Sequence, residues 1–170
     1  MSAHLVVLVG HGGVPTDAPR DLVVRLKQLE AARRQRGGPA TEEERTIERT
    51  LRNWPRTAEN DPYRIGLEAI ATALAPLILP HRLRVAYNEF CAPSLDDALD
   101  AAAAEGIDRV SVLTTMVTPG GSHANREIPE IVAAARERHP GLLVDYAWPY
   151  DPTGVAAFLA HHLERHLGVA

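Results

Sequence analysis

The sequence predicts an α/β fold, an open parallel sheet of about four strands flanked by helices. Short apolar runs of strand type alternate with longer segments of helical periodicity. Proline and glycine mark most of the boundaries between the two. At 170 residues and 45% hydrophobic content, the chain is long enough for one ordinary core and short for two. We therefore expect a single domain over residues 1–170.

The predicted strands are short runs rich in branched or long aliphatic side chains, and they cover residues 5–9, 83–88, 109–114 and 142–147. The first and third have the clearest pattern, and the second and fourth are weaker. Each run is followed by turn residues and then by a helical pattern. This order is typical of parallel strands joined by helical crossovers.

Helix-start signals precede four of the helical segments. An Asp-Pro pair, a capping side chain followed by proline at the first helical position, stands at Asp61 and again at Asp151. Ser94 opens a third helix, and Pro129 fits the first turn of a fourth. Apolar residues then follow at helical spacing, including Tyr63, Leu67, Ile70, Leu74 and Leu77 in the first segment and Val155, Phe158, Leu159 and Leu163 in the last.

The sequence predicts no strand in residues 20–60 and two helices separated by the Gly37-Gly38-Pro39 turn. We interpret this stretch as a helical hairpin inserted after the first strand. It contains 10 of the 18 Lys and Arg against 7 acidic residues, so the insert is at +3 and the remainder at -7. A solvated face of mixed charge explains this pattern, and a basic lid or interface is the alternative.

The composition limits the partners and the compartment. A net charge of -4 argues against nucleic acid, whose binding needs a clustered excess of basic residues. A single cysteine, Cys91, excludes an intramolecular disulfide and favours a reducing cytoplasm. The apolar run LVVLVG is far shorter than the roughly 20 residues that cross a bilayer. We expect a soluble, cytoplasmic protein that has no membrane partner.

Three side chains suited to metal binding follow predicted strands. His11 comes directly after the first strand, Glu89 after the second, and His123 lies in a glycine-containing loop after the third. In open parallel sheets ligands bind outside the carboxyl ends of the strands, so these residues are expected to converge. Two imidazoles and one carboxylate suit Fe, Co, Ni or Zn with open coordination positions.

The segments VGHGG, NEFCAPSLDDAL and VLTTMVTPGGSHANREIPEIV resemble, in this order, the motifs of the sirohydrochlorin cobaltochelatase and ferrochelatase family, the class II chelatases. That family has a GHGS-type first turn, a FLEF-x-x-PSL-type segment and a GGH-x-x-x-D-[IL]-P segment. The match covers residues 3–13 and roughly 61–165 and leaves out the hairpin. It implies a flavodoxin-like or chelatase-like fold and insertion of Co²⁺, Fe²⁺ or Ni²⁺, the metal substrate, into a tetrapyrrole without an organic cofactor.

Residue by residue, the resemblance implies that His11 and His123 are metal ligands and proton acceptors and that Glu89 assists them. Family members are commonly built from two such halves, so it also implies a homodimer or pairing with a second chelatase-like half. The backbone N–H groups of glycine-rich turns bind anions, which makes Gly12, Gly13, Gly120 and Gly121 candidates for the substrate's carboxylates. Arginine candidates for the same groups are Arg20, Arg33, Arg34, Arg36 and Arg126.

The sequence departs from the family pattern at several points. Gly13 replaces a serine, Ser122 separates Gly121 from His123, and Glu127 stands where aspartate is usual. None of these changes removes a proposed ligand. The hairpin is the largest departure, and it lies in the sequence directly after His11. It could be a lid over the site, a dimer interface or a block on catalysis.

Other functions remain open on the sequence. A chelatase-like protein that holds metal or tetrapyrrole for delivery is one, and an interaction scaffold that uses the hairpin is another. Histidine phosphatases also place a catalytic histidine after their first strand, although they prefer an arginine where this chain has Gly10. His162 and His166, four residues apart, are a second candidate for zinc or nickel. We expect Cys91 to be a packed residue, with metal ligation as the alternative.

Overall fold

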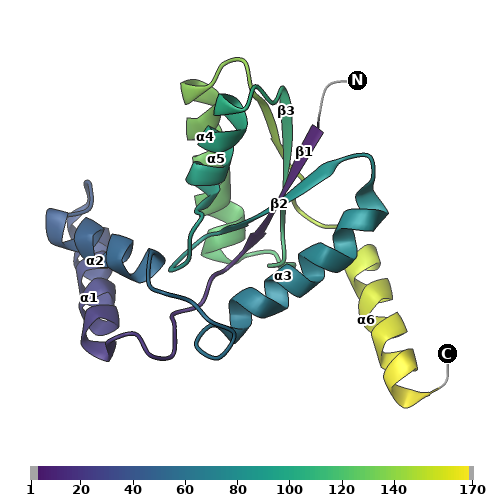
Figure 1. The fold of residues 1–170 in the computed structure, drawn as a ribbon, viewed down its shortest axis with the longest axis horizontal. Coiled ribbons are helices and arrows are strands. Elements are labelled where there is room, and N and C mark those ends of the chain that lie inside the picture. The colour runs from purple at the N-terminus through teal and green to yellow at the C-terminus, as the bar shows by residue number, and fades with distance from the viewer. Residues whose placement is uncertain (1–3, 169–170) are drawn as a thin grey trace.

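A computed structural model describes residues 4–168 and contains a four-stranded sheet in the order β2-β1-β3-β4 (Figure 1). The strands are β1 (His4–Gly10), β2 (Arg82–Tyr87), β3 (Arg109–Thr114) and β4 (Leu143–Tyr146). Every pairing between neighbouring strands is parallel. The predicted α/β class and parallel sheet are therefore confirmed. The strand bounds differ from the sequence-based ones by one residue or none at each end.

The helices are α1 (Arg20–Arg36), α2 (Glu42–Arg52), α3 (Pro62–Leu74), α4 (Leu95–Ala104), α5 (Ile128–Arg138) and α6 (Pro152–Leu167), with short turns η1 (Ala75–Ile78) and η2 (His123–Glu127). The predicted caps form. Asp61 accepts a hydrogen bond from the backbone N–H of Arg64, and Ser94 forms a capping box with Asp97. Each cap satisfies N–H groups that a helix end leaves without partners.

Helices cover the two faces of the sheet differently. On one face α4 and α5 pack against inward-facing residues of β1 and β3, forming the largest apolar cluster, which includes Leu5, Val7, Val110 and Val112. On the other face α3 buries Leu67 and Ala71 against Leu8 and Tyr87. The alternation along each strand thus directs successive side chains to opposite layers.

Helices α1 and α2 lie beyond the carboxyl end of β1, away from the main body (Figure 1). They have their own apolar cluster, in which Leu26, Ile47 and Leu51 pack against Phe90 from the loop after β2. That loop carries Glu89. The hairpin therefore packs directly on the segment that follows β2.

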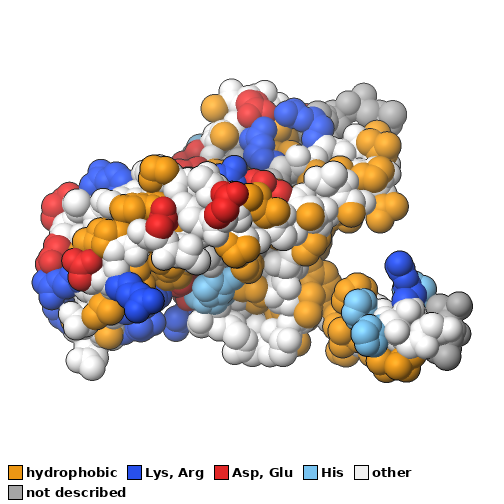
Figure 2. All heavy atoms as spheres, turned by 60° about the horizontal axis from the view of Figure 1, so that its bottom comes forward, with side chains coloured by type: hydrophobic (Ala, Val, Ile, Leu, Met, Phe, Trp, Pro, Cys, Tyr) orange, Lys and Arg blue, Asp and Glu red, His pale blue; other side chains and the backbone are white. Residues whose placement is uncertain are grey.

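Helix α6 projects from the body and buries none of its residues (Figures 1 and 2). The apolar face foreseen at this helix is present but exposed, with Phe158 at 68% and Leu159 at 58%. In α3 also, Ile70 is exposed although it fits the apolar periodicity. Periodicity identifies an apolar face, but it does not say what covers that face. Within residues 4–168 no helix is long and apolar enough to cross a membrane.

Candidate metal site

His11, Glu89 and His123 converge at the carboxyl edge of the sheet, where their ligand atoms all lie within 4.8 Å of one another. His11 directly follows β1, Glu89 follows β2, and His123 begins η2 after β3. The two imidazole rings are 4.7 Å apart between centroids and meet edge to face at 86°. All three side chains are half-buried, so the group is formed in the fold and still open to solvent.

Backbone contacts align the two loops that carry His11 and Glu89. The backbone N–H of Asn88 donates to the carbonyl of Gly10 at 2.9 Å, and that of Glu89 donates to the carbonyl of His11 at 2.8 Å. The parallel pairing of β1 and β2 thus continues past the ends of both strands. Gly12 permits this approach, because it has φ +93° and a Cβ there would overlap the Glu89 carbonyl.

The orientation of His11 follows from its partners. Its Nδ1 lies 2.8 Å from the carbonyl oxygen of Gly12, which can only accept, so Nδ1 carries the proton. The backbone N–H of His11 donates to the Tyr63 hydroxyl oxygen at 2.6 Å. The remaining ring nitrogen, Nε2, keeps its lone pair for a ligand.

Glu127 orients His123 in the same way. Nδ1 of His123 lies 2.8 Å from the Glu127 carboxylate and 2.8 Å from the amide nitrogen of Asn88, which donates to the same carboxylate at 3.0 Å. We assign the ring proton to Nδ1, because the carboxylate of Glu127 can only accept when it is ionised. Burial alone would raise the pKa of the Glu127 carboxyl. The hydrogen bonds from His123 and Asn88 outweigh burial, and the pKa lies below its ordinary value. Glu127 is therefore ionised near neutral pH, and Nε2 of His123 is free to bind a metal.

Two arginines of the hairpin segment hold the loop that carries Glu89. Arg52 donates to the carbonyls of Asn88 and Cys91, at 3.2 Å each. Arg56 donates to the carbonyl of Phe90 and forms a buried ion pair with Asp61, the N-cap of α3. The hairpin thus fixes the backbone on both sides of the carboxylate.

The arrangement can bind a divalent metal through two imidazole nitrogens and a carboxylate, and it leaves further coordination positions open. Lys27 lies 3.5 Å from the Glu89 carboxylate, so this ligand has a competing cation within reach. A cavity of about 510 Å³ adjoins this site, and its charged lining consists of four carboxylates and three guanidinium groups, those of Glu30, Glu89, Glu127, Glu130, Arg33, Arg34 and Arg126. Its volume falls in the range of small-molecule sites.

The other sequence candidates are placed as follows. Gly12 lies against the backbone of Glu89 and Gly13 against Tyr63 and Asp61, whereas the backbone N–H of Gly120 is already used by the Asn125 side chain at 3.0 Å. Cys91 is fully buried and burial raises the pKa of its thiol, which fits a packed residue. His162 and His166 lie on the exposed helix α6. Among residues 4–168, the group of side chains close enough to hold a metal ion does not include them.

Several residues that shape the site escaped the sequence analysis. Asn88, Tyr63 and Arg52 act through contacts to residues 36 to 52 positions away, and nothing in their local sequence marks them as site residues. The π-helical turn η2 was also missed. It places His123 and Glu127, four residues apart, in contact, and such turns occur often at functional sites.

Fold and site together define an α/β protein with a two-histidine, one-carboxylate group at its sheet edge. Residues 58–166 match the model of the CbiX family, and the chain therefore belongs to that family. No curated sequence matches the chain.

Three solved structures that align with this chain are distant in sequence. A CbiX protein from Marinobacter aquaeolei VT8, assigned to cobalamin (vitamin B12) biosynthesis, is 17% identical over 96% of this chain and 97% of its own, with a TM-score of 0.54. SirB from Bacillus subtilis with Fe3+ is 16% identical over 99% of this chain, with a TM-score of 0.50. The sirohydrochlorin chelatase SirB from Bacillus subtilis subspecies spizizenii, in complex with cobalt, is 17% identical over 86% of this chain, with a TM-score of 0.45. This chain spans 48% and 43% of the two SirB chains.

Proposed function

We propose that this protein inserts a divalent metal, Co²⁺ or Fe²⁺, into sirohydrochlorin or a related tetrapyrrole. The observation that carries the proposal is the convergence of His11, Glu89 and His123 at the sheet edge. Membership of the CbiX family and the similarity to SirB from Bacillus subtilis with Fe3+ support metal chemistry at this site.

Metal insertion requires the ring to lose two pyrrole N–H protons while the metal exchanges its ligands for four ring nitrogens. His11 and His123 each present Nε2 as a metal ligand, because Nδ1 is engaged by Gly12 and Glu127 respectively. Once the metal leaves, the same nitrogen can accept a proton, since the ordinary pKa of imidazole is near 6.5. Glu89 partly balances the charge of the metal and is a second proton acceptor.

The substrate's carboxylates need positively charged or N–H partners near this edge. In the cavity beside Glu89, the positively charged candidates are the exposed Arg34 and Arg126, because Arg33 already pairs with Glu44. The backbone N–H groups of Gly12, Gly13 and Gly121 add uncharged donors in the two loops. We propose that these groups hold the tetrapyrrole over the trio.

We propose that residues 20–60 are an insertion within a single domain. The family match begins at residue 58, near the end of this segment, and so leaves out nearly all of it, which supports the proposal. The contacts of Arg52 and Arg56 with the loop after β2 favour a supporting role for the hairpin over a block.

We propose that two copies of the chain pair to form the complete protein. The chain spans about half of each SirB chain, and α6 leaves a row of apolar side chains uncovered, Phe158, Leu159, Leu163 and Leu167. Light scattering of the purified protein tests this proposal, since a monomer at micromolar concentration would contradict it.

The proposed activity is tested by mixing the protein with sirohydrochlorin and Co²⁺ or Fe²⁺ and following the absorption spectrum of the product. Wild-type protein accelerates insertion, and His11→Ala and His123→Ala each lower the rate at least about 10²-fold, the usual scale for loss of a proton-transfer group. Unchanged rates in both variants would refute the assignment. Tight binding of metal or tetrapyrrole without product would instead indicate a delivery protein.

A further inference from the structure

We propose that the hairpin and the sheet edge together form a second cation site, which holds a hydrated divalent metal ion before it reaches His11, Glu89 and His123. The site is a small cavity of about 170 Å³ beneath α1 and α2. Its role as a loading site rests on the proposed function, but its capacity to bind a cation does not.

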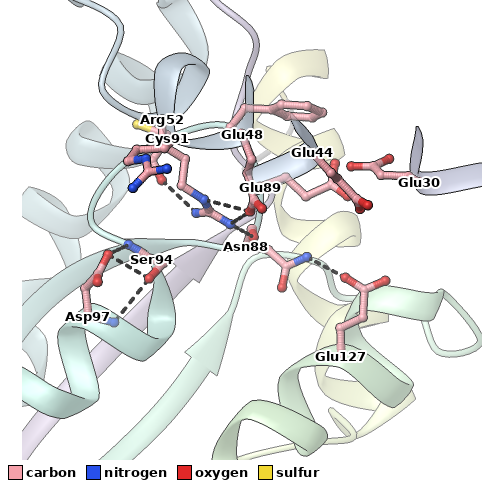
Figure 3. Close-up of polar contacts among 12 residues, drawn as sticks. Glu30, Glu44, Glu48, Arg52, Asn88, Glu89, Cys91, Ser94, Asp97 and Glu127 are labelled. Atoms are coloured by element: carbon pink, nitrogen blue, oxygen red, sulfur yellow. Dashed lines mark hydrogen bonds and ion pairs between the residues drawn. The ribbon is translucent and has the colours of Figure 1, made fainter. Parts of the chain in front are cut away.

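The cavity is strongly acidic. Carboxylates from both sides line it, namely those of Glu30, Glu44, Glu48, Glu89 and Glu127 (Figure 3). Only two lining residues are basic, Arg33 and Arg52, so the lining has a formal charge of -3. Lys27, which pairs with Glu30 and Glu89, reduces this charge to -2. A low-dielectric cavity with this charge attracts cations.

Two buried oxygen atoms of the lining lack a partner. Glu44 is 2% exposed, and its Oε1 accepts from Arg33 at 2.7 Å while its Oε2 has no hydrogen-bond partner. Oδ1 of Asn88 is likewise buried and without a partner, although Asn88 donates through its amide nitrogen to Glu127. Buried polar atoms of this kind are costly unless a water or an ion satisfies them. Both residues line the same cavity, so we place the hydrated cation beside Glu44 and Asn88.

The basic side chains are already engaged. Arg33 donates to Glu44, and Arg52 donates to Glu48 at 2.9 Å and to two backbone carbonyls. Their hydrogen bonds hold the carboxylates in place and leave the second oxygen of Glu44 for another cation. The ion pairs within the lining therefore leave Oε2 of Glu44 without a partner.

The donor set favours a hydrated ion over a dehydrated one. Within residues 4–168, the group of ligand atoms close enough for direct coordination is His11, Glu89 and His123, and it does not include Glu44 or Glu48. A water molecule occupies about 30 Å³, so the cavity has room for an ion with several waters. Oxygen ligands and retained water suit hard divalent ions such as Mg²⁺ and Mn²⁺ and also hydrated Co²⁺ or Fe²⁺.

Glu89 belongs to both sites. It lines the acidic cavity and is also the carboxylate of the trio. A metal ion that loses water as it moves toward the imidazoles can therefore keep this ligand throughout. The hairpin supplies Glu30, Glu44 and Glu48, which gives the insertion a function in metal uptake.

The binding test uses Mn²⁺, whose free concentration is read by electron paramagnetic resonance. In His11→Ala/His123→Ala protein, which lacks both imidazoles, we expect one Mn²⁺ per chain to remain bound. Adding Glu44→Gln, which keeps the size of the side chain and removes its charge, weakens this binding at least 10-fold. The matched control is Glu43→Gln on the adjacent residue, which pairs with Arg25 on the outer surface and leaves the affinity unchanged.

No Mn²⁺ binding in the double-histidine variant would overturn the proposal, as would equal affinities of the Glu44→Gln and Glu43→Gln proteins. If Glu44→Gln fails to fold by circular dichroism, Glu30→Gln replaces it, with the same expected loss. In the insertion assay, Glu44→Gln raises the metal concentration that gives half-maximal rate. The tetrapyrrole concentration that gives half-maximal rate stays unchanged. Mn²⁺ binding at this cavity without any metal insertion would refute the proposed function alone. Metal insertion that needs the same metal concentration for half-maximal rate in Glu44→Gln and Glu43→Gln would refute the loading role alone.

Discussion

Gly12 is the position at which a single methyl group should disrupt the trio. Its φ of +93° is unfavourable for any residue with a Cβ, at a cost of roughly 1–2 kcal/mol. An added Cβ would also lie 3.0 Å from the carbonyl carbon of Glu89 and overlap its carbonyl oxygen. Carbon atoms in contact prefer about 3.5–4.0 Å, so the Glu89 backbone must move by at least about 0.5 Å. Overpacking of this kind adds about 1–3 kcal/mol.

The matched control is Gly106, which has φ +71° and no atom within 4 Å of an added Cβ. Gly106→Ala has the backbone cost alone, about 1–2 kcal/mol, whereas Gly12→Ala destabilises by about 2–5 kcal/mol. For a chain of this length each kcal/mol lowers Tm by about 2–4 °C.

Calorimetry gives the two Tm values, and titration with Co²⁺ gives the affinities. We expect Gly12→Ala to bind Co²⁺ at least 10-fold more weakly and Gly106→Ala to bind it as wild type does. Equal Tm and equal Co²⁺ affinity in the two variants would refute the argument that the backbone contact between Gly12 and Glu89 aligns the site.

Three further predictions concern the groups around the trio. Glu127→Gln leaves His123 without an ionised acceptor and lowers Co²⁺ affinity about 10–100-fold, measured by titration; an unchanged affinity would contradict the orienting role. Arg56→Leu leaves the buried carboxylate of Asp61 without its positively charged partner and lowers the free energy of unfolding by about 3–5 kcal/mol, measured by urea denaturation. A loss below about 1 kcal/mol would contradict a stabilising role for this ion pair. Burial and nearby positive charge lower the pKa of His4 below 6.5, so the unfolded chain takes up this proton first as the pH falls. The contribution of neutral His4 to the free energy of unfolding is thus present above pH 6.5 and is lost as the pH falls below it. Between pH 7.5 and 5.5 the free energy of unfolding should therefore fall less in His4→Asn than in wild type. An equal fall in the two proteins would contradict the lowered pKa of His4.

The sequence was sufficient for the sheet and for the residues that the site brings together. Alternating apolar runs, Asp-Pro caps and glycine turns are local signals, and the parallel topology brings the ends of different strands to one edge. His11, Glu89 and His123 each follow a strand, so their proximity follows from the topology. Their chemical roles come from the family resemblance and remain proposals.

The contacts that orient these residues were not predictable from the sequence. The amide of Asn88 reaches Glu127, 39 residues away, and Arg52 reaches Asn88, 36 residues away. Such contacts depend on how the hairpin packs, and no local pattern encodes it. The apolar face of α6 shows the same limit, because its periodicity is correct and yet the helix has no partner within residues 4–168.

The central claim is that His11, Glu89 and His123 bind one metal ion together. X-ray absorption at the cobalt edge of protein loaded with one equivalent of Co²⁺ tests it most directly, with His11→Ala/His123→Ala protein as the reference. We predict two imidazole nitrogens at about 2.0–2.1 Å and carboxylate oxygen in the first shell, with the imidazole signal absent in the variant. An all-oxygen shell in wild type, or an imidazole signal that persists in the variant, as binding at His162 and His166 would produce, would contradict the claim.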